Sequence, residues 1–314
     1  MKIHTNTDQF KAVNPVVTIG TFDGVHLGHQ KVISRLKDFA DTHDGESVIF
    51  TFHPHPRLVT RPEETNLRLL TTLEEKKALF AASGIDHLIV FPFTKSFSEL
   101  SYGEFVKQVL VDKINTHCLV VGYDHRFGKN REGSFEYLKN CADTYGFLIE
   151  KLDALLIDES NVSSTRIRNY LQQGDIHKAN RYLGYRYTLH GNVVEGNRVG
   201  RKLGFPTANI EASDSNKLIP GYGVYAVEVI IEGKKLGGML NIGTRPTFNK
   251  NADNRSIEVH IFDFTEDIYT REITLVFVDK IREEQRFNGI VELTEQLKKD
   301  KVTALNILTK DHIS

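Results

Sequence analysis

The hydrophobic pattern of this chain changes near residue 184, and this change most limits the folds that the chain can adopt. Before it, short apolar runs alternate with segments of helical spacing. The runs are VVTIG (16–20), SVIFTF (47–52), HLIVF (87–91), CLVVG (118–122) and FLIEKL (147–152). Strands that alternate with helices are typical of βαβ units. The first part therefore predicts an α/β domain with a parallel sheet, whose ligands bind beyond the carboxyl ends of the strands.

Four segments of the first part have helical character. In residues 28–43, Val32, Leu36 and Phe39 recur at helical spacing, which predicts a helix. A second helix is expected at 73–84, where Gly84 ends it. Two more are expected at the end of this part, at 164–175 and 176–184.

After Gly184 the pattern is one of strands separated by turn residues. The expected strands lie in RYTLHGNVVEG (186–196), GVYAVEVIIEG (223–233), KLGGMLNIG (235–243), SIEVHIFDF (256–264) and REITLVFVDKIR (271–282). This pattern predicts a small antiparallel β-barrel, and residues 290–308 then predict a closing amphipathic helix. A length of 314 residues suits two domains, which we expect at 1–184 and 185–314.

Composition excludes several classes of protein. Lys and Arg number 40 against 41 Asp and Glu, so nucleic acid is not an expected partner. The two cysteines, Cys118 and Cys141, form no CxxC motif, which argues against a disulfide scaffold or a Cys-rich zinc site. The first ten residues lack an apolar stretch, and no apolar run is long enough to cross a bilayer. We expect a cytoplasmic monomer or weak oligomer.

The first candidate site follows the strand at 16–20. Gly20 and Gly24 allow a sharp turn, and His26 and His29 stand three residues apart where a helix is expected to begin. The free N–H groups of a helix start and the positive end of its dipole attract anions. The turn therefore predicts a cradle for a triphosphate, although HxxH alone also occurs in surface turns without a function.

A second segment points to the same edge of the sheet. Residues 162–168 read VSSTRIR and start a helix after the fifth expected strand. The hydroxyls of Ser164 and Thr165 and the guanidinium of Arg168 could share the phosphates. An ordinary helix cap is the alternative interpretation.

The second candidate site lies in the barrel. Residues 196–209 read GNRVGRKLGFPTAN, and this glycine-rich, basic loop suits phosphate binding, although it is not a Walker A motif. Thr207 and Asn209 project from one face of an extended chain, and their oxygens are suitable ligands for Mg²⁺ held mainly by phosphates. In IEVHI (257–261), Glu258 and His260 share one strand face. A carboxylate at Glu258 could accept the proton of a hydroxyl that attacks a phosphoryl group, whereas most such glutamates are merely solvated.

Two sets of motifs resemble the prokaryotic bifunctional riboflavin kinase/FMN adenylyltransferase (FAD synthetase) family. GTFDGVHLGHQ and SSTRIR resemble its Rossmann-like nucleotidyltransferase module, and GRKLGFPTAN, PGYGVYAVEV and NIGTRPTF resemble its riboflavin kinase module. The resemblance implies phosphorylation of riboflavin to FMN and adenylylation of FMN to FAD, with Mg²⁺, ATP, FMN and FAD as cofactors, substrates or products. It implies catalytic roles for His26, His29, Arg168 and Glu258, and metal binding by Thr207 and Asn209. It implies ATP or phosphate contacts for Gly20, Phe22, Asp23, Gly24, Gly28, Ser164, Thr165, Gly196, Arg201 and Gly204.

Two further stretches resemble the flavin-binding parts of the family. GYDHRFG (122–128) is similar to a G-x-(D/N)-F-x-F-G stretch, which implies flavin contacts for Asp124 and Phe127. His125 stands where the family usually has Phe. DKIREEQRF (279–287) is similar to the stretch that borders the flavin, which implies roles for Arg282, Glu283 and Phe287.

Two other functions also agree with these residues. One is an HxGH adenylating protein with an RNA-binding barrel, although a KMSKS-like loop is absent from the sequence. The other is a flavin enzyme in which only one site is active. Small molecules, namely riboflavin, FMN and ATP, are the expected partners in the favoured interpretation.

Overall fold

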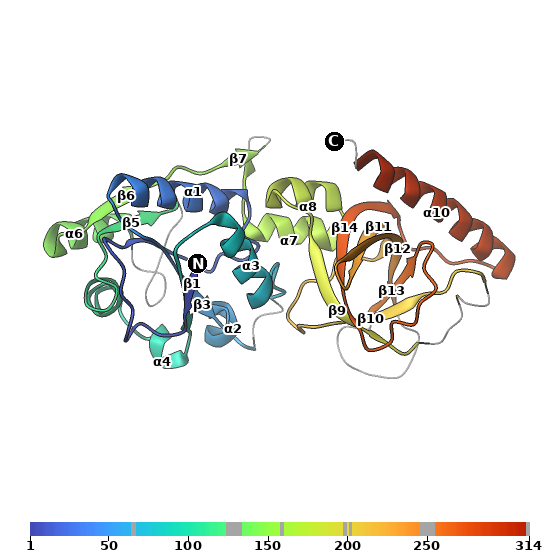
Figure 1. The fold of residues 1–314 in the computed structure, drawn as a ribbon, viewed down its shortest axis with the longest axis horizontal. Helices are drawn as coiled ribbons and strands as arrows, with labels where there is room; N and C mark the ends of the chain where they lie inside the picture. Colours follow the sequence, from blue (N-terminus) through green and yellow to red (C-terminus); the bar gives the residue numbers. More distant parts are fainter. Residues whose placement is uncertain are drawn as a thin grey trace. The chain divides into compact units, whose positions relative to one another are not determined.

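The computed structural model describes residues 1–63, 67–123, 134–157, 160–196, 200, 203–244 and 255–311. The chain forms two compact units, Met1–Ser164 and Thr165–Ser314, and each is described by itself (Figure 1).

The first unit contains a six-stranded sheet in which every neighbouring pair of strands is parallel. The strand order is β1-β4-β3-β2-β5-β6. The strands are β1 (Lys2–His4), β2 (Val16–Ile19), β3 (Ser47–His53), β4 (His87–Pro92), β5 (Cys118–Val121) and β6 (Leu148–Lys151). The five expected strands and the α/β class are confirmed, whereas β1 was not expected.

Helices and a small hairpin complete this unit. They are α1 (Leu27–Thr42), α2 (Pro56–Thr60), α3 (Leu73–Ser83), α4 (Lys95–Ser98), α5 (Tyr102–Phe105), the π-helix η1 (Val106–Val111), α6 (Phe135–Tyr145), and the two short strands β7 (Leu156–Ile157) and β8 (Ser160–Asn161). Helix α3 ends as expected, because Gly84 adopts the left-handed conformation after it.

Both faces of the parallel sheet are buried. Val16 and Val17 are 0 % exposed and belong to hydrophobic clusters on opposite faces. The buried face of α1 carries Ile33, Leu36 and Ala40. Val32 and Phe39 flank this stripe and are partly buried against the same hydrophobic cluster.

The order of the strands determines where a ligand can bind. β2 pairs with β3 on one side and with β5 on the other, so the chain reverses its direction of progress through the sheet at β2. Ligands of open parallel sheets bind at such a reversal, beyond the carboxyl ends of the strands. The turn that starts at Gly20 follows β2 directly, and residue 122 follows β5.

The second unit is a closed barrel, with helices α7 (Ser164–Gln173) and α8 (Ile176–Leu183) before it. The barrel order is β10-β13-β12-β11-β14-β9, and all of these pairs are antiparallel. The strands are β9 (Thr188–Val194), β10 (Ala208–Ala212), β11 (Gly223–Ile231), β12 (Lys234–Thr244), β13 (Arg255–Ile261) and β14 (Glu272–Arg282).

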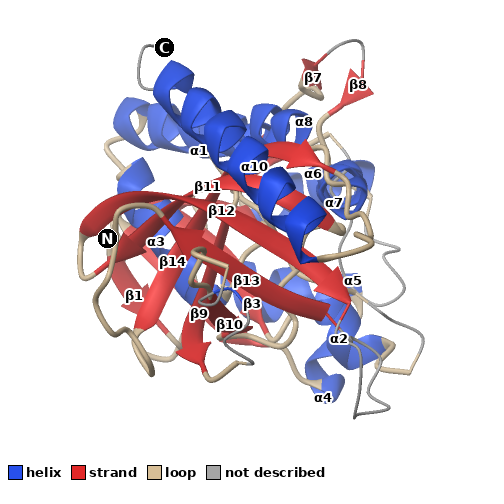
Figure 2. Ribbon diagram, turned by 90° about the vertical axis from the view of Figure 1, so that its right-hand side faces the viewer, coloured by secondary structure: helices blue, strands red, loops and turns tan. Residues whose placement is uncertain are grey.

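Helix α10 (Ile290–Asp311) is the closing helix predicted from the sequence. It packs across β11, β12 and β14, and Figure 2 shows it lying over the barrel strands. Ala304 and Leu308 of α10 join a cluster with Ala226 and Met239 of the barrel. Strand β10 was not expected, and it closes the barrel by pairing with both β9 and β13.

Candidate active sites

The turn after β2 is wound tightly by residues with positive φ. Phe22, Gly24 and Val25 have φ of 47°, 85° and 35°. Gly20 and Gly28 make room for aromatic rings, because a Cβ would lie 3.1 Å from the Phe22 ring at Gly20 and 3.2 Å from the His26 ring at Gly28. The glycines of the predicted phosphate cradle therefore allow the turn to fold back on its own side chains.

His26 and His29 lie at the start of α1, as the sequence predicted. His26 is the N-cap, and its Nδ1 accepts a hydrogen bond from the His29 backbone N–H at 3.3 Å. The two rings are stacked with centroids 3.6 Å apart at 15°. Two imidazolium rings in contact repel each other, so protonation of one ring of this pair disfavours protonation of the other.

Burial, followed by the charges of His26 and Lys76, holds the pKa of His29 well below its usual 6.5. His29 is therefore a neutral imidazole at neutral pH. Its Nδ1 is buried and has no hydrogen-bond partner among the described residues. A buried polar atom without a partner points to a bound ligand, and a neutral N–H can donate to a phosphate oxygen.

Phe22 and Asp23, both predicted to contact ATP, have side chains that build the turn. Phe22 is 3 % exposed and packs edge-on against Phe80 of α3. The Asp23 carboxylate accepts from the backbone N–H groups of Leu70 and Thr71 at 2.9 and 3.1 Å. Any contact of these two residues with a nucleotide would therefore come from their backbone.

The segment SSTRIR meets this turn through Ser164, whose Oγ donates to the Asp23 carbonyl at 2.8 Å. One expectation was wrong: α7 follows the β7–β8 hairpin and not directly a strand of the parallel sheet. Thr165 and Arg168 lie on α7 in the second compact unit. Their contact with phosphates stays a prediction.

The second site forms where β10 meets β13. Asn209 lies directly opposite Glu258 in the register of the two strands. The Thr207 hydroxyl donates to Glu258 Oε2 at 3.4 Å. The structure thus brings together the three side chains that the sequence predicted for metal binding and proton abstraction in the barrel.

Glycines pack closely against these polar side chains. A Cβ at Gly196 would lie only 1.8 Å from Asn209 Nδ2, and one at Gly200 would lie 3.4 Å from Thr207 Oγ1. Gly204 has a φ of 79°, a conformation that favours glycine. Arg201, also predicted for phosphate binding, lies outside the described residues.

His260 positions the PTAN segment. Its Nδ1 lies 2.8 Å from the Pro206 carbonyl, and because a carbonyl oxygen only accepts, Nδ1 is the donor. Burial is the main reason that the pKa of His260 is lowered. Ile257, Val259 and Ile261 are buried on the opposite strand face from Glu258, which is half-buried.

One polar residue of this site was missed by sequence reasoning. Asn241 of β12 lies directly opposite Glu258 on the other side of β13 and is half-buried. The row Asn209–Glu258–Asn241 therefore crosses three adjacent strands. NIGTRPTF contains Asn241, but only the strand register distinguishes it from any other polar residue.

The donor set fits a magnesium ion bound with ATP. The described residues contain no group of three His, Cys, Asp or Glu side chains that could hold a metal ion. The Thr207 hydroxyl and the Asn209 amide oxygen are hard oxygen ligands. Mg²⁺ commonly takes few protein ligands and completes its shell with phosphate and water.

Comparisons with known proteins match both units. An FAD synthetase family model matches residues 9–166, and a riboflavin kinase model matches residues 183–308. The bifunctional riboflavin kinase/FMN adenylyltransferase of Listeria monocytogenes is 40% identical over 295 residues, covering 94% of this chain and 93% of the relative. The enzyme of that name from Bacillus subtilis is 39% identical over 92% of this chain and 91% of the relative. The chain belongs to the bifunctional riboflavin kinase/FMN adenylyltransferase family.

A solved structure has the same fold over nearly the whole chain. A protein of Streptococcus pneumoniae described as a macrolide-efflux protein superposes with a TM-score of 0.87, at 29% identity, covering 97% of this chain and 98% of the other. In the part of the chain that the structure describes, no helix has both the length and the apolar composition that spanning a bilayer requires. The family matches confirm the Rossmann-like domain followed by a riboflavin kinase-like barrel.

Within the riboflavin kinase domain, Arg282 is engaged by α10. Its Nε and Nη2 donate to the carboxylate of Asp300 at 2.9 and 2.8 Å, and Asp300 is 1 % exposed. The Arg282 guanidinium also lies 5.6 Å from the centre of the Phe287 ring. Glu283 accepts from Lys280 at 2.7 Å. Flavin contacts of Arg282, Glu283 and Phe287 stay predictions.

Within the FAD synthetase domain, the predicted flavin residues Asp124 and Phe127, together with His125, lie outside the described residues. The strand before them, β5, is the neighbour of β2. Their flavin contacts also stay predictions.

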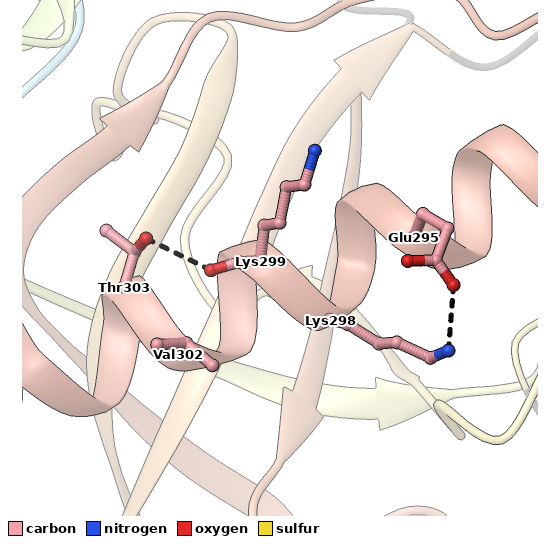
Figure 3. A pocket seen from close by; sticks show the side chains of 5 residues that line it. All are labelled: Glu295, Lys298, Lys299, Val302 and Thr303. Carbon is pink, nitrogen blue, oxygen red and sulfur yellow. Dashed lines mark hydrogen bonds and ion pairs between the residues drawn. The ribbon is translucent and has the colours of Figure 1, made fainter.

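A shallow hollow on α10 is unrelated to either predicted site. Glu295, Lys298, Lys299, Val302 and Thr303 line it (Figure 3). Lys298 pairs with Glu295 at 2.8 Å, and the Thr303 hydroxyl donates to the Lys299 carbonyl at 3.0 Å. The side chains of Glu295, Lys298 and Thr303 are therefore bonded within the helix, and none of the five lining residues was predicted to bind ATP or flavin.

Proposed function

We propose that the two sites of this family member work in sequence on the same flavin. The barrel transfers the γ-phosphoryl group of ATP to riboflavin, which gives FMN and ADP. The first domain transfers AMP from a second ATP to FMN, which gives FAD and pyrophosphate. The assembly of Thr207, Asn209 and Glu258 in one unit, and of His26 and His29 in the other, supports this proposal.

In the kinase reaction, Glu258 is the catalytic base. A ribityl hydroxyl has a high pKa, so its attack on the γ-phosphorus is assisted when a carboxylate accepts the proton. Thr207 and Asn209 would hold Mg²⁺, which supplies charge neutralisation for the phosphates when bound. The loop with Gly196, Arg201 and Gly204 wraps the phosphates of ATP. Arg282 and Phe287 border the flavin ring.

In AMP transfer, the nucleophile is already an anion. A phosphate oxygen of FMN attacks the α-phosphorus of ATP, and the bond to the pyrophosphate oxygen breaks. A strong general base is not required, so the site has to align the phosphates and stabilise the departing charge. The neutral His29, the N–H groups at the start of α1 and Gly20–Gly28 bind the phosphates.

Further residues complete the AMP-transfer site in this proposal. Ser164, Thr165 and Arg168 close over the phosphates, with His26 beside His29. Asp124 and Phe127 border the flavin. These roles rest on the match of SSTRIR and GYDHRFG to the family pattern, and on the Ser164 contact with the turn.

The domain boundary, partners and location belong to the proposal as well. We place the boundary at 184/185, because the two family models leave residues 167–182 between them and Gly184 ends α8. Small-molecule substrates suit a net charge of −1 better than nucleic acid does. We also propose a cytoplasmic location, because the protein uses ATP and its two cysteines, Cys118 and Cys141, are free and buried. We propose that it is a monomer or a weak oligomer.

A pair of variants separates the two reactions. Glu258→Gln should lower FMN formation from riboflavin at least ~100-fold while FAD formation from supplied FMN persists. His29→Ala should lower FAD formation at least ~10-fold while FMN formation persists. Chromatography of the flavins with riboflavin or FMN as starting material measures both steps. The assignment of the two reactions to separate sites is contradicted if either variant loses both activities. It is also contradicted if both variants keep both activities.

A further inference from the structure

Lys76 is a buried lysine beneath the phosphate turn, and no role followed from its place in the sequence. It lies in the first turns of α3 and is 8 % exposed. Its Nζ donates to the Thr21 carbonyl at 2.7 Å. Lysine is rarely buried without a charged partner, because burial disfavours its ammonium form. A lysine in this position therefore calls for an explanation beyond packing.

The Thr21 carbonyl belongs to the turn that follows β2. In a trans peptide, the Phe22 N–H points opposite to the Thr21 C=O. A hydrogen bond that fixes this carbonyl from the α3 side therefore also fixes the direction of the Phe22 N–H. This contact gives Lys76 a direct means of orienting the backbone of the predicted phosphate cradle.

The ionisable groups that interact with Lys76 lie on the turn after β2 and at the start of α1. Burial lowers the pKa of Lys76, and the carboxylate of Asp23 opposes that effect. Burial, then the charge of His26 and then that of Lys76 lower the pKa of His29. Asp23 is itself 2 % exposed and is held by the backbone of Leu70 and Thr71. The ammonium is thus a buried charge that interacts with a structural carboxylate and with His29.

We propose that Lys76 is a positioning residue of AMP transfer, whose ammonium orients the Thr21–Phe22 peptide and places a fixed positive charge beneath the phosphate turn. A fixed positive charge beneath the turn also favours the pyrophosphate that develops as the α-phosphorus is attacked, without reorganisation of the site. The inference rests on the proposed function of the first domain and deepens it.

Three variants of the full chain test this role. Lys76→Gln removes the charge, and its amide N–H lies one bond closer to the backbone than the lysine Nζ. Lys76→Arg keeps the charge. Lys77→Gln is the matched control, because Lys77 is the next residue of α3 and pairs with Glu74 on the helix surface at 2.8 Å.

Two readouts are needed for each variant. The first is kcat/KM for FAD formation from FMN, with FMN formation from riboflavin in the same preparation as a measure of folding and active concentration. The second is the titration of His29 by NMR of ¹³C-labelled histidine, with the resonance assigned by its absence in His29→Ala. Because the ammonium charge is one of the causes of the lowered His29 pKa, this titration reports whether the charge of Lys76 acts at the turn.

Lys76→Gln should lower kcat/KM for FAD formation at least ~10-fold and raise the His29 pKa toward 6.5, with the kinase activity unchanged. Lys76→Arg should keep the His29 pKa near that of the wild type, and Lys77→Gln should alter neither readout. An unchanged His29 titration or an unchanged rate in Lys76→Gln overturns the proposal, as does a raised His29 pKa in Lys76→Arg. If the wild-type protein itself does not transfer AMP, the proposed function is refuted. This outcome differs from one in which only the role of Lys76 fails.

Discussion

The close contact between Gly196 and Asn209 makes a sharp prediction for the kinase site. The change is Gly196→Ala, which adds one methyl group. The new Cβ would lie 1.8 Å from Asn209 Nδ2 and 2.5 Å from its Cγ. Because real Cβ atoms essentially never approach closer than 3.0 Å, the amide must move by at least 1.2 Å, the difference between 3.0 and 1.8 Å. The backbone at Gly196 is outside the left-handed region, so alanine adds a clash without backbone strain.

The size of the effect follows from this displacement. A misplacement of about 1 Å in a positioning group costs roughly 100-fold in rate. We therefore expect kcat/KM for FMN formation to fall ~100-fold, which corresponds to about 2.7 kcal/mol of transition-state stabilisation. FAD formation from supplied FMN should remain unchanged, since Gly196 lies in the riboflavin kinase domain.

Chromatographic measurement of FMN at varied ATP and Mg²⁺ concentrations tests this expectation. Gly289→Ala is the control, because a Cβ there would have no heavy atom within 4 Å. The reasoning is refuted if Gly196→Ala retains kinase kcat/KM within about threefold of the wild type. It is also refuted if Gly289→Ala shows an equal loss, because the effect would then not come from the contact with Asn209.

Three other predictions test separate parts of the structure. Thr207→Val and Asn209→Ala should each raise the Mg²⁺ concentration needed for half-maximal FMN formation, and an unaltered metal titration would count against them as ligands. Asp300→Asn should destabilise the barrel by about 2–3 kcal/mol in urea unfolding, because Arg282 loses a buried charged partner. The stability of the first domain should fall as the pH drops below 6.5, since unfolded His29 binds a proton that the folded site disfavours, and His29→Gln should reduce this slope.

The strands that the sequence predicted are those with strong apolar patterns. β2 to β6 and five of the barrel strands were found in this way. β1, KIH, was missed because it is short and polar, and only its pairing with β4 makes it a strand. β10, ANIEA, was missed because Pro206 and the glycines before it suggested a loop. Its place between β9 and β13 depends on closure of the barrel, which no local pattern reveals.

The residues of the candidate sites likewise fall into those that local sequence patterns reveal and those that only the tertiary structure reveals. His26 and His29 could be predicted because the strand, the turn and the helix start are consecutive in sequence. Thr207 and Asn209 could be predicted from their spacing on one face of an extended chain. Lys76 and Asn241 could not, because each reaches its site through tertiary structure, Lys76 from α3 and Asn241 through the register of β12 with β13.

The boundary between the two compact units falls inside the SSTRIR motif, with Ser164 on one side and Thr165 on the other. A truncation between Ser164 and Thr165 would separate the Ser164 hydroxyl, which contacts the Asp23 carbonyl, from Arg168. A stand-alone adenylyltransferase fragment should therefore extend through α7 and α8. Recombination between relatives would have to carry these two helices with the amino-terminal half, so the modules are exchangeable only with an overlap.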